Sequence, residues 1–263
     1  MAADHGAFIW YELMTTDPEG AKSFYDAVVG WSLSTGHGDD DSYGFITRSD
    51  GGMNGGVLRL SPEMLEHGAR PCWVGYLHVP DVDSAVSMIE AAGGHTLMPA
   101  TDNEIAGRFA MVADPQGAVF YVMTPKPPPG ASDAKSTVFS PDKAQHIRWN
   151  ELWASDPEAA VVFYKDLCCW TQEGAMPMGE LGDYRFIQHE GIGIGAICPV
   201  MPGGSGPRWN IYIGVDDIDR AMAAIAAGGG TLLGDAQEIP GGEFSAHARD
   251  PQGADFGIVG PRH

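Results

Sequence analysis

Two glutamates and one histidine have the residue types and the spacing for acid–base chemistry. Glu12 and Glu151 stand at matching places in two apolar segments that read as strands, and His78 lies in a third. Alternation along a strand places all three on inward faces. An inward carboxylate needs a hydrogen-bonding partner or loses its charge, so each glutamate is either held structurally or poised for proton transfer. His78 is the general-base candidate of the first half. It has no counterpart in the second half, where Gly214 takes its place.

The same strand faces carry aromatic and sulfur side chains that suit a flat or hydrophobic small molecule. The alternative is ordinary core packing, which is the more frequent role of Trp and Tyr on strands. Two glycines on these faces, Gly214 and Gly257, predict more room in the second half. The predicted ligand-binding residues are Trp10, Met14, Tyr76, Tyr121, Trp149, Trp153, Asn210 and Tyr212.

The cysteines indicate a reducing compartment, which we take to be the cytoplasm. The chain has four of them, Cys168 and Cys169 are adjacent, and no CxxC spacing occurs. The adjacent pair ends a predicted helix and has no histidine nearby in the sequence. A nucleophilic role is therefore not expected for it. The first residues lack the charged and apolar regions of a signal peptide, and no segment is apolar enough for a membrane helix.

The charge balance excludes several partner classes. The chain has 35 acidic and 15 basic residues, a formal net charge of −20. Nucleic acid requires lysine and arginine to neutralise its phosphates, and anionic membrane surfaces repel an acidic protein. We therefore expect neither nucleic acid nor a membrane as a partner. We expect a small-molecule ligand or substrate instead.

An internal repeat sets the domain organisation. The pattern Trp-x-Glu-Leu, Asp-Pro-Glu and Phe-Tyr that begins at Trp10 recurs from Trp149, and Asp114-Pro-Gln-Gly-Ala recurs from Asp250. Blocks repeated in the same order indicate a tandem duplication. We expect a first domain over residues 1–124, a proline-rich, semi-extended linker over 125–145 and a second domain over 146–263.

Each copy reads as alternating strands and helices. Asp17-Pro18 and Asp156-Pro157 are N-caps followed by an N1 proline, and an apolar face follows at helical spacing. Second helices are expected near Asp83 and from Asp219 to Ala227. The Asp-Pro-Gln-Gly turns lead into final strands over 119–123 and 255–259. The fold class is α+β, with two βαβββ modules in each copy.

These motifs, in this order and duplicated, resemble the vicinal oxygen chelate superfamily, which includes glyoxalase I, bleomycin-resistance proteins and extradiol dioxygenases. The Trp-x-Glu-Leu start of both copies is similar to a tandem, glyoxalase-like subgroup. The resemblance implies that the two modules of each domain form an eight-stranded cup. It also implies metal-ligand positions at Trp10, Val74 and Tyr121 in the first domain, and at Trp149, Asn210 and Gly257 in the second.

None of these six residues is a His, Asp or Glu, the usual ligands of a divalent metal. We therefore expect no metal and no cofactor. The favoured function is metal-independent binding of a small aromatic or amphipathic molecule, as in bleomycin-resistance proteins. The alternative is a metal-free lyase, isomerase or glyoxalase-type enzyme that uses Glu12 with His78, or Glu151 with Asp255. A metal-dependent glyoxalase or dioxygenase ranks third. A monomer and a homodimer are both compatible with the sequence.

Overall fold

The computed structural model describes residues 4–36, 42–127 and 135–263. The first copy contains β1 (Phe8–Thr15), α1 (Pro18–Val29), β2 (Ser32–Leu33), β3 (Tyr43–Thr47), β4 (Met53–Arg59), α2 (Pro62–Glu66), β5 (Cys72–His78), α3 (Val82–Ala91), β6 (His95–Asn103), β7 (Gly107–Ala113) and β8 (Val119–Pro125). The second contains β9 (Ile147–Ala154), α4 (Pro157–Cys168), β10 (Thr171–Pro177), a 3₁₀ turn (Gly179–Leu181), β11 (Asp183–His189), β12 (Ile192–Pro199), β13 (Arg208–Gly214), α5 (Ile218–Ala227), β14 (Thr231–Leu232), β15 (Gln237–Glu238), β16 (Phe244–Arg249) and β17 (Asp255–Gly260).

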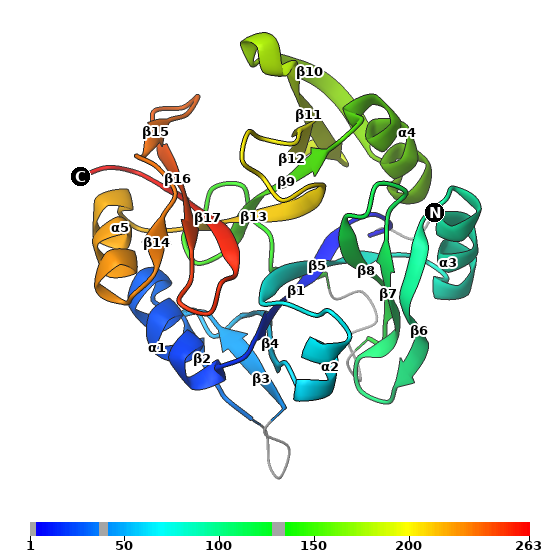
Figure 1. Ribbon diagram of the computed structural model, residues 1–263, viewed down its shortest axis with the longest axis horizontal. Helices are drawn as coiled ribbons and strands as arrows, with labels where there is room; N and C mark the ends of the chain where they lie inside the picture. The colour runs from blue at the N-terminus through cyan, green and yellow to red at the C-terminus, as the bar shows by residue number, and fades with distance from the viewer. Residues whose placement is uncertain (1–3, 37–41, 128–134) are drawn as a thin grey trace. The chain divides into compact units, whose positions relative to one another are not determined.

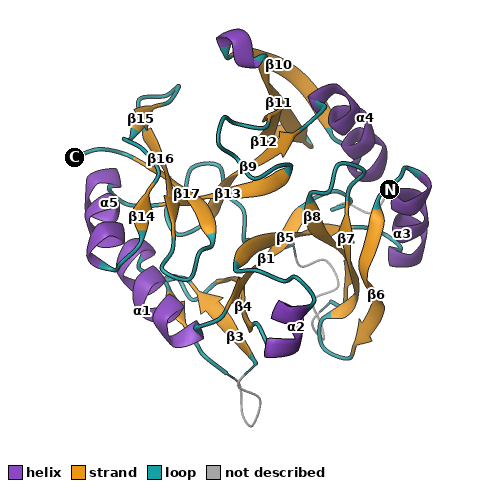
Figure 2. Ribbon diagram, in the orientation of Figure 1, coloured by secondary structure: helices purple, strands orange, loops and turns teal. Residues whose placement is uncertain are grey.

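The strands form one sheet in each copy, and the predicted α+β class with two βαβββ modules per copy is confirmed (Figure 1, Figure 2). The strand order is β2-β3-β4-β1-β5-β8-β7-β6 in the first sheet. In the second sheet it is β10-β11-β12-β9-β13-β17-β16-β14, and β15 pairs with β16.

The first helix of each copy begins where its capping residues require. Asp17 accepts a hydrogen bond from the Gly20 amide at 3.0 Å, and Asp156 accepts one from the Ala159 amide at 3.1 Å. A proline follows each cap, where a helix needs no amide hydrogen. The second helices begin one residue before the predicted aspartates, because Asp81 and Asp217 are the caps. The predicted aspartates occupy the first turns, where the helix dipole favours acids.

By compactness, the chain divides into two units that each take segments from both copies. Unit 1 comprises the described residues of Met1–Ile9, Gly75–Ser136 and Asn150–Trp209. Unit 2 comprises those of Trp10–Val74, Thr137–Trp149 and Asn210–His263. Each unit thus combines most of one module from the first copy with most of one from the second.

A buried tyrosine links the two modules of unit 2. Tyr25 on α1 donates to Asp250 Oδ2 at 3.1 Å, and Trp73 Nε1 donates to the Tyr25 hydroxyl at 2.9 Å. The Asp250 Oδ1 atom accepts from the turn amides of Gly253 and Ala254, each at 2.8 Å. Burial raises the pKa of both Tyr25 and Asp250. The Asp-Pro-Gln-Gly turn of one copy therefore anchors the first helix of the other.

Unit 1 repeats this network with the copies exchanged. Tyr164 on α4 donates to Asp114 Oδ2 at 3.1 Å and accepts from Trp209 Nε1 at 3.0 Å. The rings of Trp170 and Tyr164 stack at 5.5 Å. Burial again raises the pKa of the tyrosine and of the aspartate. The repeated Phe-Tyr, Trp and Asp-Pro-Gln-Gly residues thus have a structural role.

The end of the predicted linker is part of unit 2 rather than a semi-extended spacer. Thr137 O accepts a hydrogen bond from Arg48 Nη1 at 3.2 Å, and the Gln145 amide donates to Gly214 O at 2.7 Å. Phe139 forms an isolated parallel bridge with Ile147. The prolines of the predicted linker did not prevent this pairing, because the backbone amides and carbonyls of the residues around them can still form hydrogen bonds. Residues 128–134 of the predicted linker lie outside the described residues.

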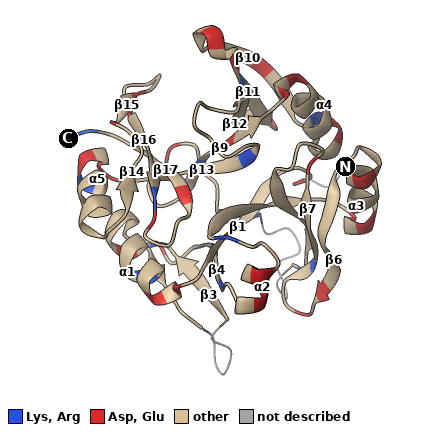
Figure 3. Ribbon diagram, in the orientation of Figure 1, with Lys and Arg blue, Asp and Glu red and all other residues tan. Residues whose placement is uncertain are grey.

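Acidic residues lie on each of the five α-helices in the described part of the chain (Figure 3). Each of these helices has one in its first turn: Glu19, Glu63, Asp83, Glu158 and Asp219. This position stabilises a helix through its dipole, so part of the chain's acidity has a local structural use. Among the described helices, none has the length and apolar character needed to cross a membrane.

Candidate functional site

Both carboxylate oxygens of Glu151, on β9 in unit 1, accept hydrogen bonds. Its side chain is buried, with 3% exposed. One carboxylate oxygen accepts from Trp153 Nε1 at 2.7 Å, and the other accepts from the Tyr184 hydroxyl at 2.7 Å. Burial and this carboxylate together raise the pKa of Cys198. Two short bonds from neutral donors hold the Glu151 carboxylate in one orientation.

A cation and an aromatic ring complete this part of unit 1. The Arg208 guanidinium lies over the Trp153 ring, 4.3 Å from its centroid. Tyr184 packs edge-on against Phe186 with ring centroids 5.8 Å apart. We call Glu151, Trp153, Tyr184 and Arg208 the Glu151 cluster. It unites a buried acid, an aromatic face and a positive charge, the groups that orient a polar aromatic molecule.

Unit 1 also holds the predicted tyrosine pair. Tyr76 on β5 and Tyr121 on β8 stack with centroids 4.1 Å apart and planes 11° apart. Phe109 on β7 meets both rings edge-on. The structure thus brings together two predicted ligand-binding residues, and their parallel strands explain why. Tyr76 and Tyr121 are register partners in the β5–β8 pairing.

His78 ends β5 and is half-buried in unit 1. Its backbone pairs with the start of the chain, with the His78 amide donating to Ala7 O at 2.9 Å. Burial lowers the pKa of the imidazole. Within the described part of the chain, its Nδ1 atom is buried without a hydrogen-bond partner. These properties fit a neutral imidazole, and its predicted role as a general base stays a prediction.

In unit 2, the predicted residues of β1 have partners that the sequence did not single out. Trp10 Nε1 donates to the Tyr43 hydroxyl at 3.0 Å, and Phe45 lies edge-on to the Trp10 ring. Glu12 is 2% exposed, and Met14 is also buried. Burial and the Glu12 charge raise the pKa of Cys72 to about 12. Glu12 belongs to unit 2 and His78 to unit 1, so their joint action stays a prediction.

The second-copy residues of unit 2 correct one expectation. Tyr212 shares a hydrogen bond of 2.8 Å with His247 Nε2, and Asn210 is buried, while Trp149 is partly exposed. We expected Gly214 and Gly257 to leave room. The Tyr212 ring instead occupies the space beside Gly257, where a Cβ would lie 2.3 Å from it. Backbone of residue 143 fills the space beside Gly214 in the same way.

The sequence did not single out Tyr43, Tyr184, Arg208 or His247 as partners. A signal for two of them was present, because Tyr43-Gly-Phe45 and Tyr184-Arg-Phe186 are repeated Tyr-x-Phe segments. They lie on β3 and β11, the corresponding strands of the two copies. Asp255, the suggested partner of Glu151 in the acid–base alternative, forms an ion pair of 2.6 Å with Arg249.

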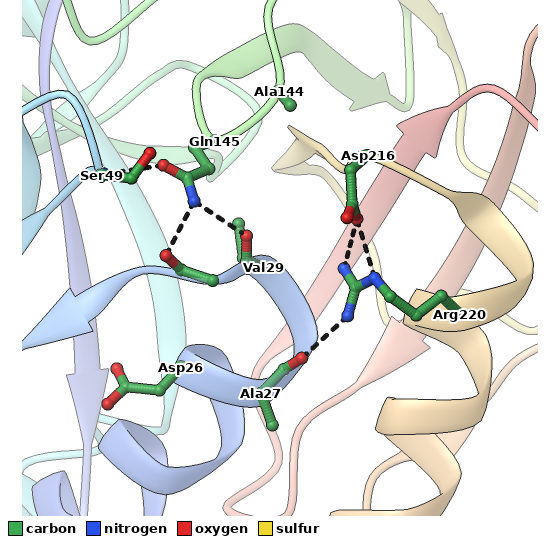
Figure 4. A pocket seen from close by; sticks show the side chains of 9 residues that line it. Asp26, Ala27, Val29, Ser49, Ala144, Gln145, Asp216 and Arg220 are labelled. Atoms are coloured by element: carbon green, nitrogen blue, oxygen red, sulfur yellow. Dashed lines mark hydrogen bonds and ion pairs between the residues drawn. The ribbon is translucent and has the colours of Figure 1, made fainter.

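Two surface cavities, one in each unit, lie away from these strand faces. In unit 2, a cavity of about 450 Å³ surrounds the end of α1 (Figure 4). Gln145 donates to Gly30 O at 2.7 Å and accepts from the Ser49 amide at 2.8 Å. Arg220 donates to Ala27 O at 3.0 Å and pairs with Asp216. The polar groups of this cavity thus satisfy one another. In unit 1, a more apolar cavity of about 600 Å³ lies between α3 and α4.

The family model "Glyoxalase/Bleomycin resistance protein/Dioxygenase superfamily" matches this chain twice, at residues 7–122 and 143–258. The chain belongs to this superfamily. The two matches follow the two copies of the repeat, so each copy inferred from the sequence is one domain of this superfamily.

Curated relatives align along almost the whole chain. CFP32 of Mycobacterium bovis, provisionally named a glyoxylase, is 31% identical over 258 residues, which cover 96% of this chain and 94% of that protein. The anthracycline biosynthesis protein DnrV of Streptomyces peucetius is 27% identical over 271 residues, covering 97% and 93%.

Solved structures share the fold at low identity. The Mn(II)-bound glyoxalase from Novosphingobium aromaticivorans superposes with a TM-score of 0.64 at 17% identity and covers 99% of this chain and 83% of its own. A variant of homoprotocatechuate 2,3-dioxygenase from B. fuscum gives 0.67 at 14% identity, covering 100% and 74%. At this identity the likeness establishes the fold alone.

The residues of this chain do not fit the three-ligand metal centre that the superfamily implies. The six positions named above hold Trp, Val, Tyr, Trp, Asn and Gly. In the three described segments, no group of three or more His, Cys, Asp or Glu side chains is arranged to hold a metal ion. Trp10 offers only an N–H donor, and that donor is bonded to Tyr43.

Proposed function

We propose that this superfamily member is a metal-independent binding protein for a small, flat aromatic or amphipathic molecule. The observation that carries the proposal is the exchange of residue types on the strands. Where the superfamily pattern calls for metal ligands, this chain has mostly aromatic, apolar or amide side chains. Aromatic rings with a few fixed polar groups are the usual lining of a small-molecule site.

The polar edges of these aromatic residues are bonded within the protein. Trp10 donates to Tyr43, Trp153 donates to Glu151, and Tyr212 is bonded to His247. The hydrogen bonds fix the ring planes, which lowers the entropy lost when a ligand stacks on them. Arg208 over Trp153 adds a charge that favours a ligand with phenolate or carboxylate groups.

The names of two relatives suggest a chemical class for the ligand. DnrV and DauV, both aligned over 97% of this chain, are anthracycline biosynthesis proteins. Anthracyclines contain a flat, fused aromatic ring system. A ligand of similar shape suits the ring-rich strands of this chain, and we propose that class for its ligand.

A fluorescence titration with 1,4-dihydroxyanthraquinone tests this proposal. The protein contains seven tryptophans, so a stacked quinone should quench its emission. We expect a Kd of about 10 µM or tighter, unchanged by EDTA. Trp153→Leu should weaken binding about tenfold or more, and Phe244→Leu, an aromatic residue outside the predicted set, should leave it unchanged. Binding weaker than about 1 mM, or binding lost with EDTA, would contradict the proposal.

Glu151 favours one alternative, a metal-free acid–base enzyme. A buried carboxylate can take a proton from the carbon adjacent to a substrate carbonyl, and the bond from the Tyr184 hydroxyl would hold the Glu151 carboxylate in position for that transfer. CFP32 carries a glyoxylase name, which makes 2-oxoaldehydes the first substrates to try. Turnover of methylglyoxal with a thiol that is lost in Glu151→Gln, but kept in Glu158→Gln on the exposed face of α4, would establish this alternative.

We place this binding in the cytoplasm, where the four free cysteines would stay reduced. The protein would act as a monomer or a homodimer. Cell fractionation and sedimentation of the purified chain test these two expectations.

A further inference from the structure

The last helical turn of α4 ends in an unusual residue for its backbone conformation. Cys169 caps the helix with φ +57°, in the left-handed region, and its amide donates to Lys165 O at 3.0 Å. The corresponding residue of the first copy is Gly30, with φ +80°. Glycine is the usual residue at this cap, because a Cβ is disfavoured there. The second copy thus keeps an exposed thiol in a strained conformation, a feature that tends to accompany function.

A histidine far away in the sequence reaches this thiol. His5 Nδ1 lies 3.6 Å from Cys169 Sγ, within hydrogen-bonding distance for sulfur. His5 Nε2 lies 2.8 Å from Leu167 O. A carbonyl oxygen only accepts, so Nε2 carries the hydrogen, an assignment made from the bonding pattern. In the neutral imidazole, Nδ1 is then the lone-pair acceptor that faces the thiol.

Neighbouring groups fix the position of His5. His189 Nε2 bonds to the His5 carbonyl at 2.8 Å, and Trp170 Nε1 donates to Gly6 O at 2.8 Å. Lys135 pairs with Asp4 at 3.1 Å. A nucleophile, a base and a group that orients the base are the three parts of an activated-thiol site. Cys169, His5 and the Leu167 carbonyl supply them in that order.

The other three thiols of the chain are poorly placed to compete. Burial raises the pKa of Cys72 to about 12, and it also raises the pKa of Cys168 and of Cys198. Cys169 is the exposed one of the four. Because a thiolate is the reactive form, a soft electrophile should meet a single reactive cysteine in the folded chain.

We propose that Cys169 and His5 form a thiol–disulfide exchange site for low-molecular-mass disulfides that are neutral or cationic. His5 Nδ1 takes the thiol proton, and the thiolate attacks one sulfur of the disulfide. A new bond forms at Cys169 Sγ, the disulfide bond breaks, and the leaving thiolate takes the proton from the imidazolium. Cys169 is oxidised and half of the disulfide is reduced. The net charge of −20 disfavours anionic disulfides. This site does not rest on the proposed ligand binding.

Reaction with cystamine, a cationic disulfide, tests the site in the full-length protein. Intact-mass spectrometry should show one mixed disulfide per chain, and peptide mapping should place it at Cys169. At pH 7, His5→Gln keeps a donor for Leu167 O but lacks the base, so we expect reaction about tenfold slower or more. His67→Gln, an exposed histidine elsewhere, should react like the natural protein.

Two further measurements separate chemistry from folding. At pH 10, hydroxide in the solvent can replace His5 as the base, so the rates of His5→Gln and the natural protein should converge. Tryptophan fluorescence should be unchanged in His5→Gln, because Trp170 lies next to the site. Glutathione disulfide, an anion, should react more slowly than cystamine at low salt. Equal rates for His5→Gln at pH 7, or adducts spread over several cysteines, would overturn the proposal. Faster reaction of glutathione disulfide would overturn its ligand class.

Discussion

The C-terminal ends of α1 and α4 have the same backbone conformation in the two copies but carry different side-chain chemistry. Both helices end in a left-handed residue, Gly30 in one and Cys169 in the other. Both caps are followed by a tryptophan whose Nε1 donates to a backbone carbonyl at 2.8 Å, Trp31 to Gln145 O and Trp170 to Gly6 O. The backbone arrangement therefore survived the duplication.

The side chains that satisfy the last carbonyls of each helix differ. At α1, Arg220 donates to Ala27 O at 3.0 Å (Figure 4) and to Val28 O at 2.8 Å. Gln145 donates to Gly30 O, so the side chains at this helix end have no nucleophilic chemistry. At α4, His5 bonds to Leu167 O and turns its other nitrogen to Cys169. Free carbonyls at a helix end must be satisfied, but several residue types can do so. In the second copy, the residue that bonds to a last carbonyl of α4 is a histidine, which also lies next to the Cys169 thiol.

The largest effect should come from the buried tyrosine network, which occurs once inside each unit. Tyr25→Phe leaves Asp250 Oδ2 and Trp73 Nε1 without this partner, and Tyr164→Phe does the same to Asp114 and Trp209. We expect each to lower the free energy of unfolding by about 2–3 kcal/mol, because unsatisfied buried polar groups are costly. Urea denaturation measures both. A large effect in one unit alone would show that the networks are not equivalent.

The two helix caps should respond in opposite directions. Gly30→Ala places a Cβ in the left-handed region and 2.9 Å from Gln145 Nε2. It should cost about 1–2 kcal/mol. Cys169→Gly should raise stability by about 1 kcal/mol and abolish reaction with cystamine. The same urea series measures the stabilities. A loss of stability in Cys169→Gly would mean that the thiol is retained for packing rather than reactivity.

The smallest effect should be a change in pH dependence at His78. Its pKa in the folded protein is lowered from 6.5, mainly by burial. The unfolded chain therefore binds the proton more readily, and this group's contribution to stability is present above pH 6.5 and declines as the pH falls below it. His78→Gln should flatten the fall in unfolding free energy between pH 7 and 5. An unchanged slope in matched urea titrations would contradict a buried, neutral imidazole.

Local sequence signals predicted most of the fold. Capping aspartates, N1 prolines and the Asp-Pro-Gln-Gly turns mark helix starts and last strands, because these residues bond to backbone atoms a few positions away. Which module packs with which was not predictable. The Tyr25–Asp250 bond spans most of the chain, and a duplication makes both pairings look alike in the sequence.

The candidate site was less accessible to sequence reasoning. Glu12 and Glu151 are buried, but alternation along one strand could not show that Tyr184 bonds to Glu151 from another strand. The same limit hid His5 from Cys169, since periodicity reports on faces of one element and not on contacts between distant ones. The expected room beside Gly257 failed for a related reason, because the neighbouring Tyr212 ring fills it.

Native mass spectrometry of the protein incubated with Mn²⁺, Fe²⁺ and 1,4-dihydroxyanthraquinone tests the proposed metal-independent binding most directly. We predict one organic adduct per chain, at the same occupancy with and without the two metals, and no retained ion. One divalent ion per chain, with the organic adduct appearing only beside it, would contradict this account and point to ligands displaced from the six superfamily positions.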